Sequence, residues 1–213
     1  MTKIIPLLQG GDNCYILENG GRAALVDTGR KRTRKRLLKA LAPWNIELIL
    51  LTHGHFDHIY NAAFLAREYN AKIALSEADL ELARDNRIHE IHSRGLLGYF
   101  IRKVSVASIN RIRTDAFEPS FFLRDGQALD AYGFDGASII ALPGHTEGSV
   151  GILCGGACIA GDSVMSMGGV SAARIAEDFE KADQSVKVLR ETGAEVFYPG
   201  HGGPIPRKKL LAL

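Results

Sequence analysis

The sequence predicts an α/β protein in which two β-sheets pack face to face and helices cover the outer faces. Three observations lead to this prediction. Residues 48 to 75 read as strand, helix and strand, which implies parallel pairing through a right-handed crossover. From Phe121 onward the chain consists mainly of short apolar runs that are typical of strands. Each strand-rich half ends in a helical pattern, so both sheets have helices available for their outer faces.

Length and composition are consistent with one domain. The chain has 213 residues, of which 46% are apolar, and this is enough to bury a substantial core. We find no repeat of solenoid period and no linker, so we expect a single domain spanning residues 1–213. The apolar runs are about ten residues or shorter, and we expect neither a membrane span nor a signal peptide.

The first half begins with a hairpin. Strand-like runs at residues 13–18 and 23–27 flank Gly20 and Gly21, a pair that is typical of a tight turn. The elements expected next are a basic helix at 30–41, the central strand from Leu48, a helix at 59–68, a strand at 72–75 and a capped helix from Ser76.

The second half is predicted to be richer in strands. Residues 80–118 read as an insertion of amphipathic helices, in which Gly95 and Gly98 are expected to be breaks. Beyond the insertion we expect a helix at 175–192 and strands at 121–123, 128–129, 137–142, 150–154, 157–160 and 196–199.

Four side chains that can bind metal ions follow the central strand directly. Residues 52–58 contain His53, His55, Asp57 and His58. His53 and His55 point to the same side of an extended segment, because successive side chains of a strand alternate. Asp57 stands near a helix start and His58 points elsewhere, toward a second metal ion. Metal binding is favoured over the alternative in which Asp57 only caps the helix and the histidines lie on the surface.

Three more candidate ligands stand at the ends of later apolar runs. They are His145, Asp162 and His201. Because binding sites in open sheets assemble where strand ends meet, we expect these residues to gather at one edge. Seven ligands exceed what one tetrahedral zinc ion needs and suit two metal ions with one bridging carboxylate. A cap or a core histidine at position 145, and a turn cap at Asp162, are the less favoured alternatives.

These segments resemble the metallo-β-lactamase-fold hydrolases, and most closely their glyoxalase II-like branch. The resemblance rests on residues 52–58, Pro143-Gly144-His145-Thr146, Gly161-Asp162 and Pro199-Gly200-His201-Gly202. It implies a four-layer αββα metallo-β-lactamase sandwich in which the helical insertion around residues 80–118 covers the active site. That insertion is then the expected source of substrate selectivity and a candidate for a homodimer contact.

The resemblance also implies a role for each candidate residue. The first metal ion is assigned to His53, His55 and His145, the second to Asp57, His58 and His201, and Asp162 is the bridge. Asp27, at the end of the second hairpin strand, is expected to orient ligands without binding a metal ion. A hydroxide that bridges the two ions is the expected nucleophile, and Asp57 is expected to act catalytically as a proton shuttle. Zinc is the expected metal, with iron or manganese as alternatives, because this ligand set is not selective among them.

The activity implied is hydrolysis of a small thioester, lactone or related ester. Glyoxalase II-like enzymes act on a glutathione thioester, but only about a dozen residues follow His201, so the helical region that helps to hold glutathione is not in this sequence. A persulfide dioxygenase with one iron is less favoured, because residues 163–169 do not match the segment typical of those enzymes. A non-catalytic sensor is disfavoured because every ligand is present.

A nuclease of the same superfamily is the main alternative, because tRNA-processing and mRNA-degrading relatives share the His-x-His-x-Asp-His core and because charge is unevenly distributed in this sequence. The net charge is +2, yet seven of the ten residues from Arg30 to Lys39 are Lys or Arg. This basic run could bind phosphates, but a solvated helix face above Leu37, Leu38 and Leu41 is favoured. We therefore expect a small-molecule substrate rather than a nucleic acid, and no membrane partner.

The cysteines give a weaker indication of the cellular compartment, and two further histidines give a weaker indication of their place in the fold. Cys14, Cys154 and Cys158 include no C-x-x-C pair, which favours reduced thiols in a cytoplasmic protein. His89 and His92 stand three apart without an obvious carboxylate partner, so we expect them on the surface or in the substrate pocket.

Overall fold

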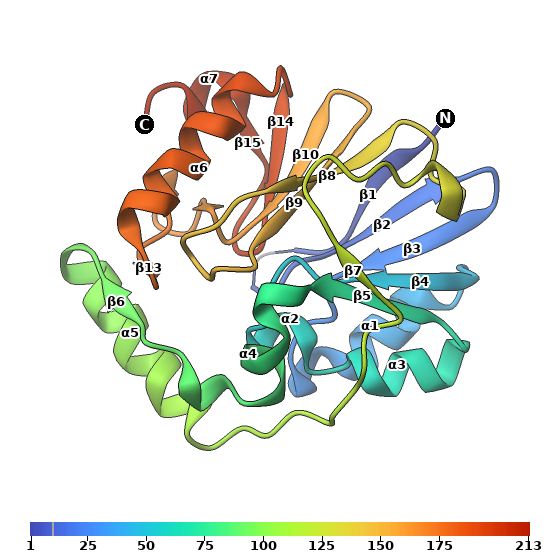
Figure 1. The fold of residues 1–213 in the computed structure, drawn as a ribbon, viewed down its shortest axis with the longest axis horizontal. Coiled ribbons are helices and arrows are strands. Elements are labelled where there is room, and N and C mark those ends of the chain that lie inside the picture. The colour runs from blue at the N-terminus through green and yellow to red at the C-terminus, as the bar shows by residue number, and fades with distance from the viewer. Residues whose placement is uncertain (10) are drawn as a thin grey trace.

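Two mixed β-sheets lie face to face at the centre of the molecule, and helices cover their outer faces (Figure 1). The computed structural model describes residues 1–9 and 11–213. This arrangement confirms the predicted α/β sandwich of four layers.

The first sheet runs in the order β1, β2, β3, β4, β5 and β7. The bounds of these strands are Lys3–Leu8, Cys14–Asn19, Arg22–Val26, Ile46–Leu50, Lys72–Ser76 and Phe121–Leu123. Strands β1 to β3 pair antiparallel and the later pairs are parallel. The predicted hairpin is formed by β2 and β3, and both glycines of its turn have positive φ. The parallel pair of β4 and β5 confirms the strand, helix and strand expected at 48–75.

The second sheet runs in the order β15, β14, β10, β9 and β8. The bounds are Ile205–Pro206, Val196–Pro199, Ala157–Gly161, Val150–Cys154 and Ala137–Ala141. Strands β10 and β14 pair in parallel, and the other neighbours pair antiparallel. The strand expected at 128–129 is reduced to one isolated bridge between Ala128 and Ser138.

The facing sides of the sheets meet in one buried cluster, which includes Leu17, Val26 and Leu50 from the first sheet and Ile139 and Ile152 from the second. Because side chains alternate along a strand, the other side of each sheet is free to pack against helices. The helices α1 (Arg34–Leu41) and α3 (Ala62–Tyr69) cover the first sheet. The helices α6 (Phe179–Glu191) and α7 (Arg207–Leu210) cover the second.

The basic run lies mostly on the solvent side of α1 and of the 3₁₀ turn before it. Leu37 and Leu41 are fully buried beneath it, while Lys35 and Arg36 are exposed. This matches the solvated helix face that the sequence favours. In the part of the chain that the structure describes, no helix combines the length and apolar character needed to cross a membrane.

The insertion contains α4 (Leu80–Arg84), β6 (His92–Ser93) and α5 (Gly95–Ile109), and α5 lies at the edge of the molecule beside β13 (Ile175–Ala176) (Figure 1). Gly98 lies inside α5 and does not break it. A Cβ at this position would come 2.5 Å from Arg174 O, so glycine permits the close contact.

The helix expected from residue 175 begins only at Phe179. The two residues of β13 pair with β6 instead of joining the helix. Asp178 then caps α6, because its side chain accepts hydrogen bonds from the N–H groups of Glu180 and Lys181.

Candidate metal centre

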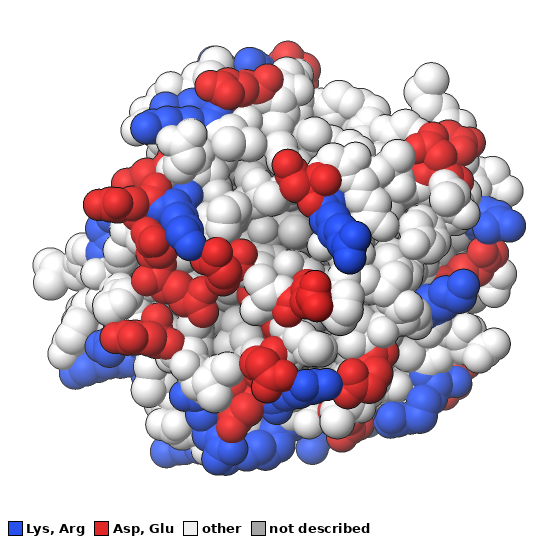
Figure 2. Space-filling view, viewed as in Figure 1, with Lys and Arg blue, Asp and Glu red and all other residues white. Residues whose placement is uncertain are grey.

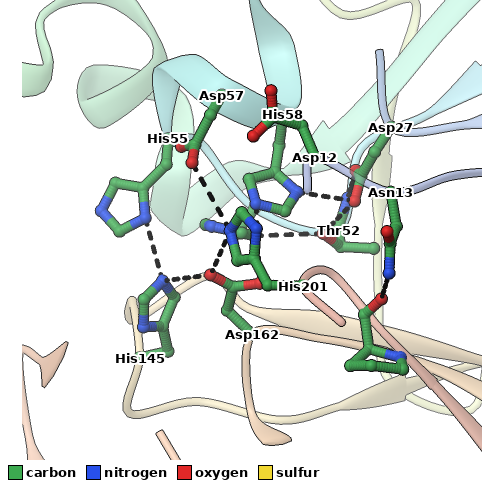
Figure 3. Close-up of polar contacts among 12 residues, drawn as sticks. Asp12, Asn13, Asp27, Thr52, His55, Asp57, His58, His145, Asp162 and His201 are labelled. Atoms are coloured by element: carbon green, nitrogen blue, oxygen red, sulfur yellow. Dashed lines mark hydrogen bonds and ion pairs between the residues drawn. The ribbon is translucent and has the colours of Figure 1, made fainter. Parts of the chain in front are cut away.

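The seven candidate ligands gather where strand ends of the two sheets meet. Figure 3 labels all of them except His53. After β4 the chain turns through residues 51–55 into α2 (Phe56–Ile59), which carries Asp57 and His58. The other three ligands follow strands of the second sheet: His145 follows β8, Asp162 follows β10 and His201 follows β14. Both sheets therefore contribute to one centre.

The ligand atoms form three overlapping groups, two of which match the ligand sets expected for separate metal ions. The ligand atoms of His53, His55 and His145 lie within 4.8 Å of one another, and so do those of Asp57, His58 and His201. In the first group His55 Nδ1 is 2.9 Å from His145 Nε2. In the second group Asp57 Oδ2 is 3.5 Å from His201 Nε2. These groups coincide with the two sets that the family resemblance assigns to separate metal ions.

Asp162 lies between the two groups. Its Oδ2 is 3.5 Å from His145 Nε2 and 3.2 Å from His201 Nε2. Its Oδ1 is 3.6 Å from His58 Nε2. A bridging carboxylate needs this position between ligands of both ions.

Three buried atoms in the centre lack a hydrogen-bond partner among the described residues. They are His53 Nε2, His58 Nε2 and Asp162 Oδ1, and these three residues can themselves surround an ion. Leaving a buried polar atom unpaired costs roughly 1–3 kcal/mol. Imidazole nitrogens and carboxylate oxygens are donors that suit zinc, iron and manganese. The residues present therefore fit divalent metal ions.

Burial keeps the histidines of the first group neutral. Desolvation lowers the pKa of His53, His55 and His145, because burial penalises the charged imidazolium. Neighbouring imidazoles lower the pKa of His53 and His55 further. A neutral imidazole has a lone pair available for a metal ion, so these three side chains are ready to bind.

In the second group, nearby carboxylates raise the pKa values of the histidines instead of leaving them lowered by burial. Burial lowers the pKa of His58, but Asp27 and Asp162 outweigh it and raise that pKa to about 9. The pKa of His201 is likewise raised by Asp162 and Asp57 against the effect of burial. Burial raises the pKa of Asp57 and Asp162, yet the nearby histidines hold both pKa values below the usual range. Metal binding at the second group must therefore displace protons.

Asp27 supports the centre from behind, in the position expected for it. Its left-handed backbone, with φ of 58°, is uncommon for a residue other than glycine. The Asp27 carboxylate accepts hydrogen bonds from the Thr52 N–H at 2.9 Å and hydroxyl at 2.8 Å. Asp27 Oδ2 is also 2.8 Å from His58 Nδ1, which leaves His58 Nε2 facing the centre (Figure 3).

Asp79, expected only at the start of a capped helix, connects two of the ligand loops. Its carboxylate accepts hydrogen bonds from the Gly54 and Gly148 N–H groups, each at 2.7 Å, and from the Thr146 hydroxyl at 2.8 Å. Gly54 separates His53 from His55, and Gly148 lies on the loop of His145. These partners lie 25 to 69 residues from Asp79, so no local pattern in the sequence identifies them.

Arg30 brings a positive charge to the rim of the centre. Its Nη2 lies 2.5 Å from Asp12 Oδ1 and 3.4 Å from Asp57 Oδ2. Arg30 belongs to the basic run, which was expected to be a solvated face, and it departs from that expectation. The sequence signal for this location is that Arg30 follows Asp27, which is itself expected beside the metal centre, by three residues.

A cavity of about 320 Å³ opens onto the metal centre. Its polar end is formed by Arg30 and by five of the candidate ligands, namely His55, Asp57, His145, Asp162 and His201. The remaining wall is mainly apolar, and α5 contributes Phe100, Ile101, Val104 and Ile109 to it. The insertion therefore covers the site, as the family resemblance predicts.

The fold and the centre together define the class of protein. Residues 8–201 match the Metallo-beta-lactamase superfamily, and the chain belongs to that family. Its buried His and Asp side chains form candidate sites for metal ions of the kind expected in this superfamily.

Three relatives with named functions are similar to the chain. The atrochrysone carboxyl ACP thioesterase of Aspergillus fumigatus is 28% identical over 92% of this chain and 52% of its own length. The probable polyketide biosynthesis zinc-dependent hydrolase BaeB of Bacillus velezensis is 27% identical over 94% of this chain and 77% of its own length. The hydroxyacylglutathione hydrolase of Acidiphilium cryptum is 31% identical over 77% of this chain and 53% of its own length. The chain thus spans about half the length of the first and third relatives.

The crystal structure of TTHA1623 in a di-iron-bound form has a similar fold. It superposes with a TM-score of 0.69 at 25% identity, covering 99% of this chain and 96% of that one. The relatives therefore include a zinc-dependent and a di-iron-bound protein.

Proposed function

We propose that this protein is a thioesterase that hydrolyses small acyl thioesters with an apolar acyl group, using two divalent metal ions held by the seven ligands. The cavity is the observation that carries this proposal, because it is apolar along α5 and ends at the candidate ligands. A thioesterase and a hydroxyacylglutathione hydrolase among the relatives support the choice of a thioester over a lactone.

The shape of the cavity fits a short acyl chain. Phe100, Ile101 and Val104 can pack against methylene groups while the carbonyl lies beside His145 and His201. Its volume of about 320 Å³ is at the small end of ligand pockets. Each buried methylene contributes roughly 0.8 kcal/mol, so the wall itself can select for the acyl group.

The charge state of the centre favours a leaving group that needs no acid. In the metal-free centre nearby histidines hold the pKa values of Asp57 and Asp162 below the usual range, and as metal ligands both carboxyl groups must be ionised, so neither offers a proton to the leaving group. A thiol has a pKa of about 8.5, so it can leave as a thiolate without a strong acid to protonate it. An amine or alcohol leaving group needs that proton. This argument favours thioesters over amides and ordinary esters.

When bound, a pair of divalent ions supplies a nucleophile from water and polarises the carbonyl. The side chains of this protein hold the candidate ligands and the acyl group in place for that reaction. Arg30 holds the Asp57 carboxylate from the rim at 3.4 Å, and Asp27 orients His58. The apolar wall of α5 excludes water from the acyl group. We propose zinc as the metal, with iron as the alternative to be tested.

Charge near the cavity favours a small molecule over a nucleic acid. Among the described residues that line the cavity, Arg30 is the only Lys or Arg. On the face shown in Figure 2, acidic and basic side chains are interspersed and uncharged atoms lie between them. This distribution favours the small-molecule substrate expected from the sequence over the phosphate backbone of a nuclease substrate.

The test is a substrate panel with metal analysis of the purified protein. N-acetylcysteamine thioesters from acetyl to octanoyl are compared with their oxygen esters, with lactones and with a phosphodiester. We expect kcat/KM to rise about fourfold per methylene until the cavity is full, and the oxygen esters to react more slowly. Asp162→Ala, checked for folding by circular dichroism, is expected to be inactive. Turnover of the phosphodiester or the lactones by protein that leaves every thioester intact would overturn the proposal.

A further inference from the structure

The two ring nitrogens of His55 have different surroundings. His55 Nδ1 is 2.9 Å from His145 Nε2 and therefore faces the other ligand atoms of the first group. His55 Nε2 is 2.7 Å from His89 Nδ1. His89 was expected on the surface or in the substrate pocket, whereas its side chain is fully buried against His55.

The other nitrogen of His89 faces a carboxylate. His89 Nε2 is 2.9 Å from Glu177 Oε1, an electrostatic contact that lacks the geometry of a good hydrogen bond. Glu177 is itself held by the loop that carries His145. Its Oε2 accepts a hydrogen bond from the Glu147 N–H at 2.6 Å, and its own N–H donates to His145 O at 3.2 Å. Glu177 thus connects the loop of one ligand to the ring of another.

Only one arrangement of protons satisfies these contacts and leaves a ligand for the metal ion. His55 can bind through Nδ1 only if that atom is bare, so its hydrogen must be on Nε2, where it donates to His89 Nδ1. His89 then carries its hydrogen on Nε2, facing Glu177. The opposite tautomers would block His55 Nδ1 with a hydrogen and set a bare His89 nitrogen against a carboxylate. The negative charge of Glu177 therefore selects the productive arrangement.

We propose that Glu177 and His89 are positioning residues that fix the tautomer and ring orientation of His55 at the first metal ion. This inference rests on the proposed metal centre. The pair acts through His55 and touches no other candidate ligand side chain within the described contacts. Neither residue was singled out by the sequence for this role, because His89 and Glu177 stand 34 and 122 positions from His55 along the chain.

Metal affinity tests the proposal without relying on activity. Zinc binding is measured by competition with a chromophoric chelator in wild type, His89→Leu and Glu177→Leu. We expect each leucine variant to bind the first ion about 10–100-fold more weakly, with the second ion unaffected. His89→Gln should recover much of the loss, because a glutamine amide can accept from His55 and donate toward Glu177. Controls are His92→Leu, exposed on the same segment, and Glu147→Leu, exposed on the neighbouring loop.

Cobalt-substituted protein gives a second measurement. We expect the visible absorption bands of Co²⁺ in the first site to shift in both leucine variants and to be retained in both controls. In a double-mutant cycle, adding His89→Leu to His55→Ala should cause no further loss of affinity, because within the described contacts His89 meets the ligands through the His55 ring. Unchanged affinity and spectrum in well-folded leucine variants would overturn the inference. Failure of wild type to bind any ion would instead overturn the proposed metal centre.

Discussion

At the scale of single residues, some candidate ligands are protonated in the metal-free protein, and a metal ion must displace those protons. In the metal-free protein the pKa of His58 is raised from 6.5 to about 9 by Asp27 and Asp162, against the effect of burial. A raised pKa means that the protonated ring stabilises the folded state. This stabilisation is fully present below pH 6.5 and is lost as the pH rises through about 9.

We therefore predict a pH dependence of stability that depends on His58. With a chelator present, the free energy of unfolding should fall by on the order of 2 kcal/mol between pH 6.5 and 9 relative to His58→Gln. Urea unfolding at several pH values measures this difference. Parallel pH profiles for wild type and variant would contradict the assigned charge state.

Removing the Asp79 carboxylate should break three buried hydrogen bonds at once. Asp79→Ala leaves the Gly54 N–H, the Gly148 N–H and the Thr146 hydroxyl without their acceptor. We predict a loss of roughly 2–4 kcal/mol in the free energy of unfolding and a lower metal content, because two ligand loops lose their connection. The control Asp183→Ala removes only a surface ion pair with Arg94 and should cost less than about 1 kcal/mol. Equal losses in the two variants would show that Asp79 is not a structural connection.

At the scale of elements, α5 forms one wall of the cavity that opens onto the centre. One side of this helix lines the cavity, and its end is anchored by Ile109, which packs in a small cluster with Phe56, Ile91 and Ile175. The other side is exposed and includes Leu96, which is 81% exposed. The helix α5 thus packs on the outside of the sandwich through this small cluster, and none of its described residues contributes to the core between the two sheets.

A larger residue on the cavity side of α5 should shorten the pocket. Ser105 lines the cavity, whereas Val106 does not. We predict that Ser105→Phe lowers kcat/KM for octanoyl thioesters at least tenfold while acetyl thioesters react as in wild type, because the added ring occupies the space of the distal methylenes. Val106→Phe, on the same helix, should leave both values unchanged. An equal loss for short and long substrates would indicate a displaced helix and not a shorter pocket.

At the scale of the whole molecule, the metal centre connects the two sheets. The ligands on residues 53–58 follow the first sheet, and His145, Asp162 and His201 follow the second. Bound ions therefore stabilise the folded state, which assembles the ligands, over the unfolded chain, which does not.

Removing the metal ions should lower the melting temperature. At ion concentrations about a thousandfold above Kd, binding contributes roughly 4 kcal/mol, which corresponds to a shift of about 10 °C for a chain of this size. Differential scanning calorimetry with and without a chelator measures the shift, and adding zinc back should restore it. The double variant His145→Ala and His201→Ala should be insensitive to the chelator. A wild type that melts at the same temperature in both conditions would contradict a stabilising metal centre.

The sequence by itself determined the layers of the fold and the candidate ligands. Strands and helices follow from local periodicity, and His53 to His58 are six adjacent positions after one strand. His145, Asp162 and His201 each follow an apolar run, and strand ends at one edge of a sandwich must meet. These signals are local, so they can be read without coordinates.

Only the tertiary structure decided how the ligands are held and what can reach them. Asp79, Glu177 and the pair of Asp12 and Arg30 act through contacts between segments distant in sequence, and no periodicity encodes such contacts. Gly98 shows the same limit, because a residue that reads as a helix break is a point of close packing against Arg174. The apolar cavity is formed because α5 lies over the strand ends, so its lining depends on packing that the sequence pattern does not specify.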